Sequence, residues 1–414
     1  MSKRSLIQVG ITANMFEWYQ FCIAAFLAPN IGHLFFNSSN TFYATLQGFG
    51  LFAISYLFRP LGSIIFGLIG DKYGAAKSLQ ISLAMMTIPS ILIGLLPTFT
   101  TIGYLSTLML IILRFIQGFG AGGELPNSAV YLYQNSEKSS YHAIYCSLII
   151  ISCLSGVLLA SFIIFILHTI YTTEVINKWG WRIPFLLGIP MSFIILRIRA
   201  NINKIHSSEK STIYQQGLSR ISIMFKFVHA IALVGCEQVG FYTLFIWLPI
   251  FLTNQHKFKA LHVNAANNLS ILFLMIFTLI SAYLCSRFNY KTMLKISSFS
   301  IAFSTIPLFL WLDTTNNLLD LYVILALFAI TIGSLEGIVI FALSKIFHGF
   351  RLNSGLAISF TFASVIFGGT SPLVCTYFTH VLNLNYFAAI YVTFFATLYF
   401  IIEMTTHKLF KSIF

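Results

Sequence analysis

Five ionisable side chains stand alone inside long apolar stretches of the sequence: Glu17, Arg114, Glu124, Glu237 and Glu336. A charge at the centre of a membrane helix costs about 2.5–3.5 kcal/mol, so one that is kept there faces a cavity or a partner. A buried carboxyl can carry a proton, and a guanidinium can bind a carboxylate through two parallel hydrogen bonds. Each residue is therefore a candidate for a substrate or proton pathway, and pairing between an acid and an arginine for assembly is the alternative.

The composition indicates which elements must position these side chains. Of 414 residues, 57% are hydrophobic and 8% are charged, and the mean hydropathy is +0.85. An average soluble domain has about 25% charged residues, so these charges could not cover the surface of a soluble globule. The net charge of +13 is spread along the chain without a basic stripe, which argues against a nucleic-acid partner. We expect an all-α polytopic protein in a lipid bilayer.

Uncharged runs predict the spans. Residues 352–402 carry no charge, and neither does the stretch between Lys77 and Arg114. A span needs about 20 residues, so each run holds two helices with a turn between them. The twelve predicted spans cover residues 8–35, 46–69, 78–97, 102–132, 143–168, 181–197, 225–252, 265–286, 293–312, 320–343, 353–379 and 386–406.

The distribution of basic residues predicts the orientation. With the amino terminus in the cytoplasm, most lysines and arginines fall in cytoplasmic loops, as the positive-inside rule requires. An even number of spans then places the carboxyl terminus in the cytoplasm too. The longest hydrophilic segment, 198–224, predicts a cytoplasmic linker between six-helix bundles at 1–197 and 225–414. Residues 67–74 and 282–289 are a faint repeat half a chain apart, and similar halves around a site are typical of carriers.

Five short motifs occur in order, at residues 10–21, 59–74, 114–124, 179–185 and 367–372. With these residues the chain resembles the major facilitator superfamily, and within it the metabolite:proton symporter group that includes proline/betaine transporters. The resemblance implies two pseudo-symmetric six-helix bundles in a bacterial inner membrane. It also implies alternating access and proton symport of a zwitterion or organic acid such as proline, betaine or a dicarboxylate.

The resemblance also implies roles for individual residues. Trp18, Tyr19 and Gln20 join the five isolated charges as candidates for the substrate or proton pathway. The loop after the second span resembles a cytoplasmic gate, with Arg59, Gly67, Asp71, Lys72 and Gly74 as its residues and a partner region near Arg351. Gly368, Gly369 and Pro372 are expected to break span eleven and free backbone groups toward a cavity. Trp18, Tyr19, Phe241 and Tyr242 are candidates for an aromatic cage around a quaternary ammonium group.

Two departures from the group's pattern leave alternatives open. Gln20 stands where the group has an aspartate, and Gln134 stands where a glutamate is common. Because neither amide ionises, a proton-independent facilitator or a non-transporting sensor with the same fold remains an alternative. Nucleophile–base and metal-ligand groupings are absent, and the six cysteines show no CxxC spacing, so we expect no enzyme, no cofactor and no metal. We expect a monomer, and we expect His229 to be either interfacial or satisfied by a partner.

Overall fold

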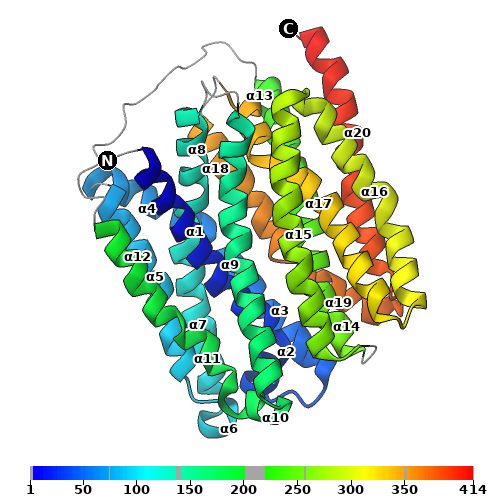
Figure 1. Ribbon diagram of the computed structural model, residues 1–414. Coiled ribbons are helices and arrows are strands. Elements are labelled where there is room, and N and C mark those ends of the chain that lie inside the picture. The colour runs from blue at the N-terminus through cyan, green and yellow to red at the C-terminus, as the bar shows by residue number, and fades with distance from the viewer. Residues whose placement is uncertain are drawn as a thin grey trace. The chain divides into compact units, whose positions relative to one another are not determined.

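The computed structural model describes residues 3–73, 75–136, 141–200, 220–255, 258–348 and 352–413. Within these ranges the regular structure is helical throughout, and the helices are joined by short turns (Figure 1).

The first three predicted spans coincide with α1 (Lys3–Phe26) and α2 (Ala28–Phe36), with α3 (Thr41–Leu57) and α4 (Arg59–Tyr73), and with α5 (Ala75–Leu95). The fourth coincides with α7 (Tyr104–Gly120), η1 (Ala121–Gly123) and α8 (Glu124–Ser136). The fifth coincides with α9 (His142–Ile170), and the sixth with α11 (Arg182–Leu186) and α12 (Gly188–Ala200). The connections contain the short α6 (Phe99–Ile102), α10 (Thr173–Val175) and η2 (Ile176–Gly180). The last six coincide with α13 (Arg220–Phe241), η3 (Tyr242–Trp247) and α14 (Leu248–Asn254), α15 (Ala260–Arg287), α16 (Tyr290–Thr314), α17 (Leu318–Ile346), α18 (Leu352–Ala363), η4 (Ser364–Gly368) and α19 (Ser371–Leu382), and α20 (Phe387–Ile413).

These helices have the length and composition of membrane spans. Within the described ranges, eight helical stretches are long and apolar enough to cross a bilayer, and α1 and α2 form a ninth that is bent by 64°. Three shorter apolar helices, Gln80–Leu95, Tyr104–Gly120 and Arg182–Phe193, coincide with the third, fourth and sixth predicted spans. Every predicted span therefore coincides with a helical segment, and the prediction of an all-α polytopic protein is confirmed.

The backbone irregularities follow from local sequence. Pro29 lies in the first turn of α2, where its missing N–H interrupts the hydrogen-bond ladder and permits the bend after α1. In span eleven, the π-helical turn η4 ends at Gly368, and α19 begins at Ser371 with Pro372 in its first turn. Span seven contains a second π-helical turn, η3. Wide turns of this kind are uncommon and are often found at functional sites.

The chain forms two compact units. The first comprises residues 1–125, 152–211 and 250–265, and the second comprises residues 126–151, 212–249 and 266–414. In the first unit, α3 packs on α2 and α7, and α5 packs on α4 and α7. In the second, α16 lies beside α17 and α20, whereas α13 contacts α17, α18 and α20 (Figure 1). The division into bundles at 1–197 and 225–414 stays a prediction.

Glycine allows the closest of these helix contacts. A Cβ added to Gly118 of α7 would overlap the carbonyl oxygen of Ser55 in α3, and one added to Gly62 of α4 would overlap that of Phe119. Because the obstacle is backbone in both cases, a side chain could be accommodated only if the helices moved apart. Small residues have this role in membrane helix packing.

We predict that Gly118→Ala destabilises the first unit by about 1–3 kcal/mol, the usual cost of overpacking. Gly180→Ala is the matched control, because its new Cβ would lie 3.4 Å from the nearest atom, the carbonyl oxygen of Val175, at an ordinary contact distance. Thermal unfolding of the detergent-purified variants measures the difference. Equal midpoints for the two variants would contradict the prediction.

Candidate functional site

Glu17 of α1 forms a buried ion pair with Arg59, the first residue of α4. Its Oε1 lies 3.1 Å from Nη2 of Arg59, and the two side chains are 1% and 6% exposed. The guanidinium carbon lies 4.1 Å from the ring centre of Phe21 and 4.4 Å from that of Tyr56. Glu17 and Phe21 are four residues apart, so they face Arg59 from the same side of α1. The structure thus pairs Glu17 with Arg59, the arrangement expected if this acid serves the assembly of the helices.

Arg114 of α7 is another buried cation among the described residues of the first unit. It is 1% exposed, its Nη1 donates a hydrogen bond of 3.0 Å to Oε1 of Gln117, and its guanidinium carbon lies 5.7 Å from the ring centre of Phe185. Its Nε and Nη2 have no hydrogen-bond partner among the described residues. A guanidinium has five N–H donors in a fork that fits a carboxylate, so this group has donors to offer a ligand.

Gln20 and its neighbours supply further polar groups. Gln20 is buried, and neither its amide oxygen nor its nitrogen has a hydrogen-bond partner in the described part of the chain. Its Nε2 would lie 3.2 Å from a Cβ added to Gly188 of α12, and Oγ of Ser90 in α5 would lie 3.8 Å from the same atom. Helices α1, α5 and α12 therefore bring Gln20 and Ser90 to one glycine.

The aromatic candidates are buried. Trp18 is 5% exposed, and the hydroxyl of Tyr19 donates a 2.7 Å hydrogen bond to the carbonyl oxygen of Pro184. In the second unit, the rings of Phe241 and Tyr242 meet edge to face with their centres 5.1 Å apart. The cage stays a prediction.

The predicted cytoplasmic gate is only partly visible. Lys72 lies exposed at the end of α4, with its Nζ 5.1 Å from the ring centre of Tyr73. Gly67 and Asp71 belong to α4, and Glu124 begins α8, but the side chains of the two acids lie outside the described part of the structure. Gly74 and Arg351 lie outside the described residues altogether. The gate therefore stays a prediction.

In the second unit, two buried acids meet across helices. Glu237 of α13 and Glu336 of α17 are 3% and 2% exposed, and their carboxyl groups are hydrogen-bonded to each other. Nε2 of Gln238 donates a further hydrogen bond of 2.8 Å to Oε2 of Glu237. The sequence analysis treated each glutamate as a lone acid, because nothing in the spacing of residues on separate helices shows that they meet.

A third acid of this unit escaped the sequence analysis. Oε2 of Glu403, in α20, lies 2.7 Å from Nε2 of His229 in α13, and the hydroxyl of Tyr399 donates to the same oxygen at 3.4 Å. His229, which we expected to be either interfacial or satisfied by a partner, is thus paired. The available signal was Glu403 itself, a charge inside the predicted span 386–406.

A cluster of aromatic and basic side chains was also missed. Nε2 of His142 lies 2.9 Å from the carbonyl oxygen of Tyr133, whose hydroxyl lies 3.3 Å from Nδ1 of His348. Nζ of Lys345 lies 6.0 Å from the Tyr133 ring centre and 5.4 Å from that of Phe341. These residues join α8, α9, α17 and the turn after α17 in the second unit.

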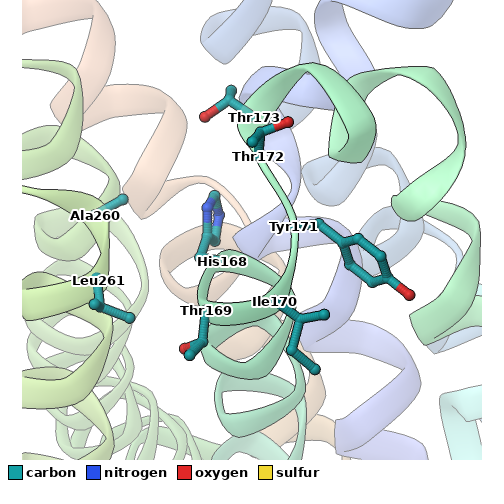
Figure 2. A pocket seen from close by; sticks show the side chains of 8 residues that line it. All are labelled: His168, Thr169, Ile170, Tyr171, Thr172, Thr173, Ala260 and Leu261. Atoms are coloured by element: carbon teal, nitrogen blue, oxygen red, sulfur yellow. The ribbon is translucent and has the colours of Figure 1, made fainter.

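A surface cavity is lined by residues 168–173 and 260–261, all in the first unit. Figure 2 shows the imidazole of His168 and the hydroxyls of Thr169, Thr172 and Thr173 among its lining side chains. None of the predicted site residues lines it. Among the described residues, no group of three or more histidine, cysteine, aspartate or glutamate side chains is arranged to hold a metal ion.

Comparisons with known proteins agree with this architecture. A model of the Major Facilitator Superfamily matches residues 10–372. The chain is 27% identical over 406 residues to an alpha-ketoglutarate permease of Escherichia coli (strain K12), covering 96% of this chain and 92% of the permease. It is 26% identical over 399 residues to a proline/betaine transporter of Salmonella typhimurium, covering 90% and 77%. These relatives confirm the prediction of a membrane transporter instead of an enzyme.

The fold has a counterpart among solved structures. A D-xylose–proton symporter superposes with a TM-score of 0.77 over 97% of each chain, at 15% sequence identity. The likeness confirms the predicted fold class.

We predict that Glu17→Gln and Arg59→Gln each lower the stability of the first unit by about 3–5 kcal/mol, because each breaks a buried ion pair by removing one of its two charges. The double variant should lose less than the sum of the two, since it leaves neither charge behind. Thermal unfolding of the four proteins in detergent completes the cycle. Additive losses would contradict a direct interaction between the two groups.

Proposed function

We infer the function from an established premise: this chain belongs to the Major Facilitator Superfamily. It is a multi-pass membrane transporter. We propose that it moves a small metabolite bearing a carboxylate, a zwitterion or an organic acid, across a bacterial inner membrane by alternating access, with a proton as the coupling ion. We further propose six-helix bundles at 1–197 and 225–414, both termini in the cytoplasm, and a monomer.

The observation that carries the substrate class is the buried guanidinium of Arg114. It makes one hydrogen bond to a neutral amide, on Gln117, and retains donors without a hydrogen-bond partner in the described structure. Burying a cation without an anionic partner is costly, and a ligand carboxylate would offset that cost when it binds. Gln117, whose Nε2 lies 3.5 Å from the carbonyl oxygen of Met86, orients the guanidinium by its hydrogen bond.

The names of the relatives support the same class. Curated relatives are named for alpha-ketoglutarate, proline, betaine, ectoine and pipecolic acid. Each of these compounds carries a carboxylate, although their other groups differ in charge and size. A site that binds the shared group through Arg114 and the variable part elsewhere would account for this range.

A proton-independent facilitator is the second candidate, and Gln20 favours it. This buried residue cannot ionise, and the acid one turn earlier on α1, Glu17, is paired with Arg59. On that view, the first unit would bind substrate without carrying a proton. Uptake driven by a pH gradient separates the two candidates, because a facilitator equilibrates its substrate and cannot concentrate it.

Counterflow in proteoliposomes tests the proposed transport. Vesicles loaded with unlabelled proline, glycine betaine or 2-oxoglutarate should transiently accumulate the same labelled compound from outside without an imposed gradient. A carrier performs this exchange, whereas a channel or a sensor does not. Failure of all three compounds to exchange would refute the proposed substrate class.

We predict that Arg114→Lys reduces counterflow at subsaturating substrate by about 10- to 150-fold, equivalent to the roughly 1.5–3 kcal/mol of one hydrogen bond to a charged group. Lysine keeps the charge but loses the planar fork. Arg182→Lys is the matched control, because Nη1 of Arg182 donates to the carbonyl oxygens of Gly94 and Leu96, both at 2.8 Å. Equal losses in the two variants would contradict substrate binding by Arg114.

The proposed orientation gives a labelling prediction. All six native cysteines are buried, so single cysteines can be added against a low background. In sealed right-side-out vesicles, a membrane-impermeant maleimide should label Ser39→Cys, and Ser208→Cys should react only after permeabilisation. The reverse pattern would overturn the orientation.

A further inference from the structure

Glu237 and Glu336 of the second unit are almost completely buried, and in the described structure neither is paired with a cation. Their carboxyl groups are nevertheless hydrogen-bonded to each other. An ionised carboxylate can only accept hydrogen bonds, so this contact requires a proton on one of the two groups.

In the part of the chain that the structure describes, no cation of the elements packed around the pair forms an ion pair with either acid. Helix α18 and the turn η4 carry no titratable side chain. The nearest cationic groups along α13 and α17 are His229 and Lys345, eight and nine residues away, or roughly 12–14 Å at 1.5 Å per residue. His229 is already paired with Glu403. The other titratable groups on the surrounding elements include Cys236, Tyr242, Tyr391, Tyr399 and Glu403, together with Tyr290, Lys291, Lys295 and Asp313 of α16 and Cys285 and Arg287 of α15. Within the described residues, none of these lysines or arginines forms an ion pair with Glu237 or Glu336.

The break in span eleven contributes to the same site. Gln238 donates its amide hydrogen to Glu237, and its Oε1 points at the backbone of Gly368 in η4. A Cβ at Gly368 would lie 2.5 Å from this oxygen and 2.9 Å from the ring of Tyr242. Glycine therefore leaves room for the amide that orients the Glu237 carboxyl. Gly368 and the acids, which the sequence analysis considered separately, belong to one arrangement.

The position of Glu336 depends on how its helix packs at the next residue, Gly337. A Cβ on the adjacent Gly337 would overlap the carbonyl oxygen of Thr278 in α15, so α17 packs directly against the α15 backbone. With that face fixed, Glu336 meets Glu237 across the contact between α13 and α17. The separation of the two carboxyls thus depends on how these two helices pack.

From this geometry we propose that Glu237 and Glu336 share one proton, and that this pair is the binding site of the transported proton in the second unit. The inference rests on the proposed symport. In the protonated state an O–H···O bond joins α13 to α17. When the proton leaves, two carboxylates repel each other in a low-dielectric surrounding, so release of the proton favours separation of the two helices. Protonation is in this way linked to helix packing.

The transport experiment compares exchange with coupling. In proteoliposomes, Glu237→Gln, Glu336→Gln and the double variant should keep counterflow of the compound that wild type exchanges, but lose accumulation driven by an inward proton gradient. Asp320→Asn is the matched control, because it is an acid-to-amide change at the start of the same helix α17, where Asp320 accepts a 2.5 Å hydrogen bond from Thr315. This control should keep both activities.

A second measurement needs no substrate. Infrared spectra of the purified protein at neutral pH should contain the carbonyl-stretch band of a protonated carboxylic acid, which should remain in Asp320→Asn and disappear in the double glutamine variant. Equal band intensity in wild type and the double variant would overturn the shared proton, whatever the transport assay shows.

The two proposals fail in different ways. If wild type exchanges none of the test compounds, the proposed substrate class fails, while the infrared comparison still decides whether the pair holds a proton. If wild type exchanges a compound and the double variant still accumulates it with the proton gradient, the coupling site is overturned while the transport function stands.

Discussion

The cost of placing a charge among membrane helices dominates this structure. With so few charged residues in the chain, a buried charge inside a span requires a local partner, and the described cases differ in which partner that is. Glu17 is paired with Arg59, Glu403 with His229, and Glu237 with the protonatable carboxyl of Glu336. Arg114 differs, because a neutral glutamine is its hydrogen-bond partner in the described structure. The positive charge of Arg114 is therefore compensated only in part, as is required of a group that binds an anionic ligand.

Helix packing makes these local solutions possible. Gly118 and Gly62 let the helices of the first unit approach backbone to backbone, and Gly337 does the same in the second. Close approach limits where a long polar side chain can go, so a buried carboxyl or guanidinium is directed to a specific partner. The π-helical turn that ends at Gly368 has the complementary effect, since it creates the space that Gln238 occupies. Glycine thus permits close contacts between helices at some positions and leaves space for a polar side chain at another.

The two units differ in their buried chemistry. Among its described residues, the first buries Arg59, Arg114 and Glu17, a combination suited to an anionic group. The second holds an acid pair joined by a hydrogen bond and a histidine–glutamate pair, which are suited to protons. A division between substrate binding in one unit and proton binding in the other would also explain why Gln20 is tolerated where related carriers are expected to have an acid.

Hydropathy and the lack of charge were enough to predict every span, because a bilayer imposes helix length and apolarity on each segment independently of the others. Motif order similarly indicated the family. Five of the isolated charges could also be recognised individually, since each is an exception within its own span, whereas Glu403 was missed. Only the tertiary structure decided which of these charges pair. Glu17 is paired with Arg59 of α4, and not with Arg114 of span four. Glu237 and Glu336 lie on two helices whose contact cannot be read from the spacing of residues along the chain. Side-chain pairing depends on how helices rotate and approach, and both are set by packing of the whole unit.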